Sequence, residues 1–396
     1  MIPSPVPDAA PAWFRKGPYL IFYPIGGALS LMGVLPWAFY AAGWGTWRPG
    51  LHALTEVQGA LVCFAIGFLF TFVPRRTGAA LPTALEISAA LALVAPPPVL
   101  SLLHFERAAH AAWALLAAFL CGFVLSRIPG AVHRRLAVAQ LMWLPTSFGL
   151  AAAGALMMAL AGAGRPVWFA PLGSALVWQG MLGGLVTGIG GMLLPMLLHR
   201  EPHRGNRSTV AWWLHGAACA VFAASFGVDE AVGLRTGYAL RGAVVLAVLC
   251  VTARLWRPPR VEGVHRWAAW FAAWMVPAGF LAVAVWPTHR VDLLHLTFLS
   301  GFTLLTLSVA NHVTIAHGGR DALLCARPVP LRVMFLSVVL ATVARLMVTI
   351  DPARVLVWLG TAFSLFAVAL GAWAVWVLPH LRPVPGAVDR PVEPSP

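Results

Sequence analysis

Charged residues are scarce in this chain, and lysine is nearly absent. Only 10% of the 396 residues are charged, and the single lysine is Lys16. Hydrophobic residues make up 60% of the chain, and the mean hydropathy is +0.81, which is more apolar surface than a soluble domain buries. The bilayer is therefore the expected solvent. The net charge of +14 is carried by arginines in short loops, so it indicates membrane topology and not a nucleic-acid partner.

Familiar catalytic motifs are missing as well. The sequence has no Walker loop, no GxGxxG after a strand, no HExxH and no nucleophile elbow, so ATP-driven transport and soluble hydrolase chemistry are unsupported. The five cysteines contain no CxxC pair, and four of them lie inside apolar segments. Neither a disulfide framework nor a thiolate zinc site is indicated.

Long apolar segments recur along the chain. A membrane-spanning helix needs about 20 mostly apolar residues. Twelve such segments are predicted at residues 19–42, 51–73, 83–104, 108–127, 138–160, 171–198, 209–227, 236–253, 267–287, 291–315, 331–349 and 354–379. The third contains three consecutive prolines, 96–98, so we expect a kinked or partly re-entrant helix there. The predicted fold class is an all-α membrane protein with about 12 transmembrane helices.

The arginines predict the orientation of these helices, because positive charge is retained on the cytoplasmic side. Alternate loops hold fifteen arginines and the opposite loops hold six. The fifteen are Arg75, Arg76, Arg127, Arg134, Arg135, Arg200, Arg204, Arg207, Arg254, Arg257, Arg260, Arg266, Arg320, Arg327 and Arg332. Both ends of the chain are then cytoplasmic, with residues 1–18 as an N-terminal segment, 19–379 as the transmembrane domain and 380–396 as a disordered tail.

The second, sixth and tenth segments have similar inner ends. Their closing stretches, which begin at Gly67, Gly188 and Gly301, end about 120 residues apart. This spacing suggests three four-helix units, although ordinary helix termination would produce the same likeness.

The second segment begins with a histidine and a carboxylate on one helical face. His52 and Glu56 lie four residues apart, and Gly59 and Cys63 continue the same stripe. A neutral imidazole is a strong ligand for haem or copper. The alternative is a histidine at the membrane interface that is hydrogen-bonded to Glu56, and the sequence leaves both readings open.

The tenth segment carries three histidines. His295 lies near its outer end and could ligate haem, with Gly301 giving a macrocycle access to the backbone. His312 and His317 lie at the inner end, about 30 Å from His295, so the three cannot share one metal. His317 could equally cap the helix C-terminus.

An inner metal cluster is a further hypothesis. His215, in the seventh segment, could join His312 and His317 there, together with His199 and His203. For the last two, scattered loop histidines are the favoured reading. Four others are expected at the surface: His133, His265, His289 and His380.

Three stretches, residues 51–78, 177–197 and 291–320, resemble the NnrS family of haem- and copper-containing bacterial membrane proteins. The third is the most specific, with a histidine, a glycine, a Thr-Leu pair and a terminal histidine before Gly-Arg. The matching residues are His295, Gly301, Thr306, Leu307, His317, Gly319 and Arg320. The resemblance implies a bacterial inner-membrane protein that binds haem and copper, and that acts in the response to nitric oxide and nitrosative stress or in denitrification.

The chain departs from the family pattern at two places. Of the two histidines and the glutamate common at the second-helix entry, only His52 is matched, and Glu56 lies one residue beyond the usual place. An arginine usual in the helix-ten motif is His312 here. The number and type of metals therefore stay open.

The helix count also resembles the catalytic subunit of haem-copper oxidases, whose second and tenth helices hold a low-spin haem. By that analogy His52 and His295 are the two axial ligands of a b-type haem. The analogy does not extend to copper, for which the inner histidines His215, His312 and His317 are a separate hypothesis. Nitric oxide or iron-nitrosyl species are the implied partners besides the bilayer. Whether the protein is an enzyme stays open, with a haem or copper redox activity as one alternative.

A secondary transporter without bound metal is the competing function. Twelve helices, a proline-broken segment and glycine-rich helices suit that architecture. Its weakness is the lack of a buried charge pair, because Arg345 has no carboxylate near it in the sequence.

Overall fold

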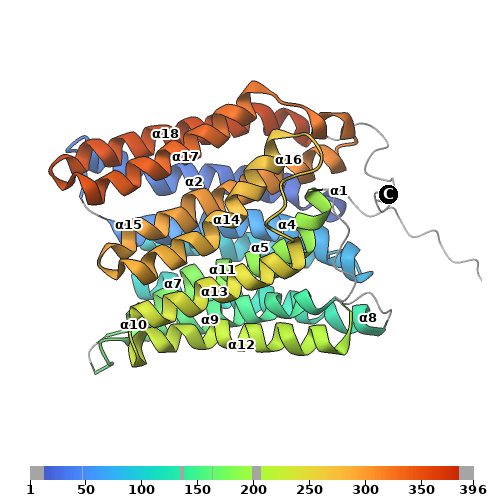
Figure 1. Cartoon of the computed structure of the whole chain (residues 1–396), viewed down its shortest axis with the longest axis horizontal. Coiled ribbons are helices and arrows are strands. Elements are labelled where there is room, and N and C mark those ends of the chain that lie inside the picture. The colour runs from blue at the N-terminus through green and yellow to red at the C-terminus, as the bar shows by residue number, and fades with distance from the viewer. Residues whose placement is uncertain (1–12, 47, 134–137, 163, 199–206, 383–396) are drawn as a thin grey trace, which may run out of the picture.

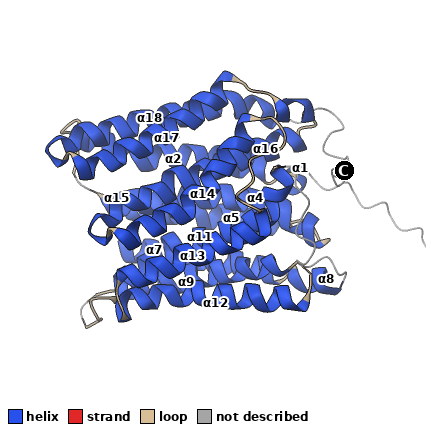
Figure 2. Ribbon diagram, viewed as in Figure 1, coloured by secondary structure: helices blue, strands red, loops and turns tan. Residues whose placement is uncertain are grey.

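The computed structural model describes residues 13–46, 48–133, 138–162, 164–198 and 207–382. Every regular element in these ranges is a helix (Figures 1 and 2). Arg134, Arg135, His199, Arg200, His203 and Arg204 lie outside the described residues, as do most of the predicted terminal segments. The predicted all-α class is confirmed.

Twelve helices are long and apolar enough to cross a membrane, and we number them spans 1 to 12. They are Tyr19–Ala41, Pro49–Thr77, Ala84–Leu102, Glu106–Gly130, Ala139–Leu160, Phe169–Leu197, Thr209–Ala231, Leu234–Ala253, Val264–Val285, Pro287–His317, Val329–Ile350 and Pro352–Leu381. Each predicted boundary lies within four residues of the observed one. The protein is a multi-pass membrane protein, as its composition predicted.

Eight spans are built on one α-helix each: α2 (Tyr19–Ala41), α7 (Glu106–Leu125), α9 (Trp143–Leu160), α12 (Thr209–Ala231), α13 (Leu234–Ala253), α14 (Val264–Val285), α17 (Val329–Ile350) and α18 (Val355–Val377). Two short helices, α1 (Trp13–Lys16) and α8 (Ile128–His133), lie outside this set. The short 3₁₀ turns are η2 (Ala139–Met142), η4 (Pro287–His289), η6 (Asp321–Cys325), η7 (Pro352–Arg354) and η8 (Leu378–Leu381).

Span 3 is kinked and not re-entrant. It consists of α5 (Ala84–Val94) and α6 (Pro96–Leu102), with Ala95 between them in a helical backbone conformation. Three consecutive prolines supply no N–H groups, so the carbonyls of the preceding turn lose their helical partners. The helix resumes where the Val99 N–H bonds to the Ala95 carbonyl at 3.5 Å.

Spans 2, 6 and 10 each contain a π-helical segment. Span 2 is α3 (Pro49–Ala53), η1 (Leu54–Leu61) and α4 (Val62–Thr77); span 6 is α10 (Phe169–Ala175), η3 (Leu176–Met181) and α11 (Leu182–Leu197); span 10 ends in α15 (Arg290–His295), η5 (Leu296–Thr303) and α16 (Leu304–His317). Each π segment holds a polar residue followed by glycine: Gln58-Gly59, Gln179-Gly180 and Ser300-Gly301, at intervals of 121 residues. Such segments often mark functional sites.

The packing of the spans follows the same threefold plan. Span 4 packs on span 5, span 8 on span 9, and span 12 on span 1, so the chain closes into a ring of three four-helix units. Spans 2, 6 and 10 are the most buried, with 89%, 83% and 67% of their apolar windows inside the protein. They therefore line the centre of the ring, and the predicted three-unit arrangement is confirmed.

The helix bundle has two ends, each marked by short helices that are labelled in Figure 1. The short helices α1 and α8 lie at one end, and α10 and α15 lie at the opposite end. We call these the α8 end and the α15 end.

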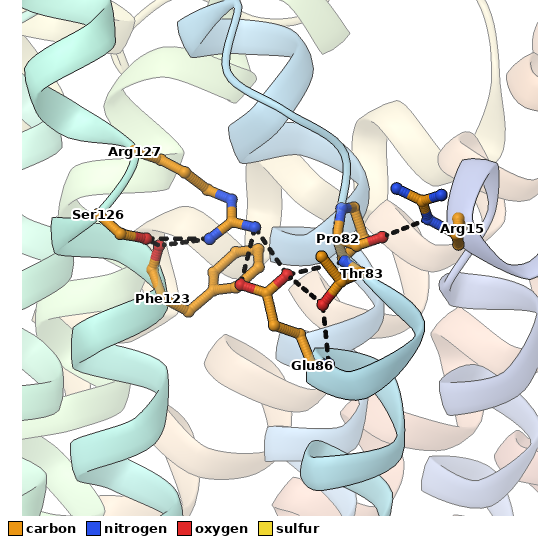
Figure 3. Close-up of polar contacts among 7 residues, drawn as sticks. All are labelled: Arg15, Pro82, Thr83, Glu86, Phe123, Ser126 and Arg127. Atoms are coloured by element: carbon orange, nitrogen blue, oxygen red, sulfur yellow. Dashed lines mark hydrogen bonds and ion pairs between the residues drawn. The ribbon is translucent and has the colours of Figure 1, made fainter. Parts of the chain in front are cut away.

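An ion pair fixes span 3 to span 4 at the α8 end (Figure 3). Arg127 donates to both carboxylate oxygens of Glu86 at 2.9 Å, and its guanidinium lies 3.6 Å from the centre of the Phe123 ring. Glu86 also completes a capping box with Thr83 at the start of α5. Nearby, the Arg15 Nε–H donates to the Pro82 carbonyl at 2.9 Å, which fastens the end of α1 to this corner.

Candidate cofactor site

His52 and His295 occupy matching places on two of the three central spans. His52 lies two residues before η1 on span 2, and His295 directly precedes η5 on span 10. Both are therefore at the α15 end and at similar depth. The two imidazoles are close enough to interact electrostatically with each other and with the Arg345 guanidinium.

The hydrogen bonds of both imidazoles assign the same tautomer. His52 Nδ1 lies 2.9 Å from the carbonyl oxygen of Gly33 on span 1, and His295 Nδ1 lies 2.8 Å from the carbonyl oxygen of Val291. A carbonyl only accepts, so each Nδ1 carries the proton and each Nε2 keeps a lone pair. Histidines that ligate metals commonly have this arrangement, because the backbone bond orients the ring.

Aromatic side chains pack against the two imidazoles. The Trp37 ring meets His52 edge to face, with centroids 5.3 Å apart. The Phe298 ring meets His295 in the same way at 6.4 Å. These contacts limit ring rotation and help to exclude water from the site.

Glu56 does not bond to His52, so the hydrogen bond considered between them is wrong. Its Oε2 accepts a hydrogen bond from Ser30 at 2.8 Å, and its Oε1 is buried with no partner among the described residues. A Cβ added at Gly33 would fall 2.6 Å from Oε1. Gly33 therefore contacts the Glu56 carboxylate, and its carbonyl oxygen accepts a hydrogen bond from His52. One turn of span 1 thus positions both side chains.

A partly buried ion pair lies beside the imidazoles. Arg345 Nη2 lies 3.1 Å from Asp292 Oδ1, and the Thr349 hydroxyl donates to Asp292 Oδ2 at 2.6 Å. The prediction that Arg345 has no nearby carboxylate is wrong. Asp292 is 53 positions away in the chain and meets Arg345 only because span 11 packs against α15.

Gly301 serves close packing in this structure. A Cβ at this position would lie 2.8 Å from the Val276 side chain, and the neighbouring Thr297 hydroxyl donates to the Val276 carbonyl at 3.0 Å. Spans 9 and 10 approach each other closely here.

The structure does not bring the inner histidines together. His312 Nδ1 lies 3.2 Å from His265 Nε2, whereas the His317 ring packs against Tyr19 with its Nδ1 on the Val313 carbonyl. His215 accepts a hydrogen bond from the Trp143 indole N–H at 3.0 Å. Within the described part of the chain, no three His, Cys, Asp or Glu side chains form a metal site, so these residues do not fit the predicted copper cluster.

His265 is buried, with 1% of its surface exposed, so its predicted surface position is wrong. It lies in the first turn of α14, which packs against α16, and this places its imidazole on His312. The pairing depends on the register between two helices, and no local pattern in the sequence reveals it.

Another charge pair, which is buried, was not predicted from the sequence. Arg241 is fully buried on span 8, where it donates to Asp229 at 2.8 Å and to the Gln179 side-chain oxygen at 2.7 Å. The Phe226 ring lies 3.8 Å from the guanidinium. An arginine inside an apolar segment is the signal that could have indicated this cluster. Gln179 is the polar residue of the π segment η3 in the second unit. Its side chain is already hydrogen-bonded to other protein groups.

The site thus contains two imidazoles with free Nε2 atoms on facing central helices of an all-α, multi-pass membrane protein. A model of the NnrS protein family matches residues 13–383, nearly the whole chain. The protein belongs to the NnrS family, as the resemblance of its three motifs predicted. The search among curated proteins found no match.

Proposed function

We propose that this protein is a haem-binding membrane protein of the NnrS type that acts in the bacterial response to nitric oxide. The observation that carries the proposal is that His52 and His295 occupy matching places on two central spans, each held by a backbone carbonyl with its Nε2 atom available as a ligand. Two imidazoles suffice for a haem because the porphyrin supplies the other four nitrogen ligands. The donor set therefore fits a b-type haem.

A bound haem would supply a redox-active iron that can interact with nitric oxide. The protein's own groups orient and insulate the ligands. Gly33 and Val291 fix the imidazole tautomers, Trp37 and Phe298 restrict water, and Arg345 adds a positive charge that Asp292 partly compensates. With a haem held by His52 and His295, these groups would shape the electrostatic environment of the site.

We further propose that the α8 end faces the cytoplasm of a bacterial inner membrane and that both chain termini lie there. Arg75, Arg76, Arg127 and Arg320 all gather at that end of the bundle, as the retention of positive charge requires. Nitric oxide or iron-nitrosyl species would then meet a haem nearer the periplasmic face. The family assignment does not favour the transporter alternative.

Haem content of the purified protein tests this proposal. His52→Ala and His295→Ala should each abolish haem binding in protein expressed with a haem supply. His289→Ala is the matched control, because His289 is exposed at the same end of span 10 and should keep full haem content. Equal haem content in all four proteins would contradict the ligand assignment.

A further inference from the structure

An apolar cavity lies at the centre of the threefold arrangement. It has a volume of about 90 Å³, is partly open, and is lined by spans 2, 6 and 10 and by Tyr23 of span 1, on the α8 side of the π segments. Leu61, Leu182 and Phe302 line it where the π segments end. These three residues are 121 and 120 positions apart, so each lies within one position of the equivalent place in the three units.

The same register holds along the length of the cavity. Ala65, Val186 and Thr306 form a second layer with the same spacing, 121 and 120 positions apart. One helical turn further, Phe68 and Ile189 follow the same spacing. The cavity therefore lies among corresponding stretches of the three central spans, close to the pseudo-threefold axis that relates the three units.

The lining is mostly apolar and favours an apolar occupant over water. Among the lining side chains, only Tyr23 and Thr306 carry a polar atom. A buried water needs two to four polar partners, and apolar cavities without them stay dry. An apolar cavity of about 150 Å³ takes one benzene or xenon, so a space of about 90 Å³ suits something smaller than a cofactor ring or a lipid tail.

We propose that this axial cavity is a binding site for small apolar gas molecules and that nitric oxide occupies it in the cell. Nitric oxide is uncharged, diatomic and weakly polar, so it gains from leaving water for an apolar space of this size. The choice of nitric oxide rests on the proposed function. The gas site itself rests on the cavity, its lining and its place on the axis. The cavity would hold the gas among spans 2, 6 and 10. Two of these spans carry the proposed ligands: span 2 carries His52 and span 10 carries His295.

Xenon binding to the detergent-purified full chain is the first test, measured by xenon NMR and by density in crystals under xenon pressure. Wild-type protein should bind xenon on the axis. Ala65→Phe and Val186→Phe fill the cavity from two different spans, and each should abolish the bound xenon. Ala220→Phe is the control, because Ala220 is exposed on α12 away from the axis and the substitution should leave xenon binding intact.

The use of two filling variants keeps the test valid if one of them fails to fold. The proposal is overturned by a wild-type protein that binds no xenon, by xenon that persists in both folded filling variants, or by a lipid or detergent chain occupying the axis. Nitric oxide should displace the xenon from haem-free protein. Failure to displace it would overturn the assignment of nitric oxide.

The xenon measurement does not depend on haem, so the two proposals fail separately. Xenon on the axis of a protein that never takes up haem would leave the gas site standing and remove the proposed function. A protein that binds haem but no axial xenon would remove the gas site and leave the proposed function standing.

Discussion

His52 on span 2 donates its Nδ1 proton to the carbonyl oxygen of Gly33 on span 1, across 2.9 Å. The same glycine leaves room for the Glu56 carboxylate, which fills the place of a side chain at position 33. One turn of span 1 therefore orients His52, the proposed haem ligand, and also positions Glu56, which lies on the same face of span 2.

Gly33→Ala tests this arrangement. The new Cβ would lie 2.6 Å from Glu56 Oε1, so the carboxylate or the helix must move, and His52 would lose its orientation. Overpacking of this kind costs about 1–3 kcal/mol. We expect a lower thermal unfolding temperature and reduced haem content. Gly371→Ala on span 12, where a Cβ meets nothing within 4 Å, should change neither.

Substitutions in the Arg345–Asp292 pair should shift the haem reduction potential in opposite directions. Arg345→Met removes a positive charge beside both imidazoles and should lower the potential, because the oxidised iron carries more positive charge. Asp292→Asn removes the compensating negative charge and should raise it. A redox titration followed by absorbance measures both shifts. Shifts of the same sign would show that the pair acts only through packing.

The Arg241–Asp229 pair is expected to hold the second unit together. Its side chains are 0% and 7% exposed, so removing one partner leaves an uncompensated buried charge and should cost about 3–5 kcal/mol. Arg241→Met and Asp229→Asn should each lower the unfolding temperature in detergent. The double variant should be more stable than the sum of the single effects predicts. Additive effects would mean that the two charges do not stabilise each other.

Membrane orientation can be tested with a thiol reagent that does not cross the membrane. Cys325 is exposed at the α8 end, whereas Thr288 is exposed at the α15 end and can be replaced by cysteine. The reagent should label Thr288→Cys in cells with a permeable outer membrane. It should label Cys325 only after the inner membrane is opened. The reverse pattern would invert the proposed topology.

Much of the fold could be predicted from the sequence because bilayer thickness and loop arginines constrain each helix locally. Apolar length predicts the twelve spans to within four residues, and the resemblance at His52 and His295 indicates two residues that the structure brings close together. The repeat is only partly visible, because equivalent positions often carry different residues. Gln58 and Gln179 correspond, but the third unit has Ser300 in their place.

The contacts between spans could not be predicted in the same way. Arg345 meets Asp292, and His312 meets His265, only because particular turns of separate helices pack together. Membrane helices pack through small residues and van der Waals contact, so their register is a property of whole surfaces and not of a local pattern. The axial cavity depends on that packing as well.

The absorption spectrum of the purified protein tests the central claim most directly. Protein from haem-supplied cells should show a Soret band, with the sharp bands of a low-spin bis-histidine haem after reduction, and exposure to nitric oxide should shift them. The bands should be absent from His52→Ala and His295→Ala. A wild-type protein without a Soret band, or variants that keep the wild-type spectrum, would contradict the account.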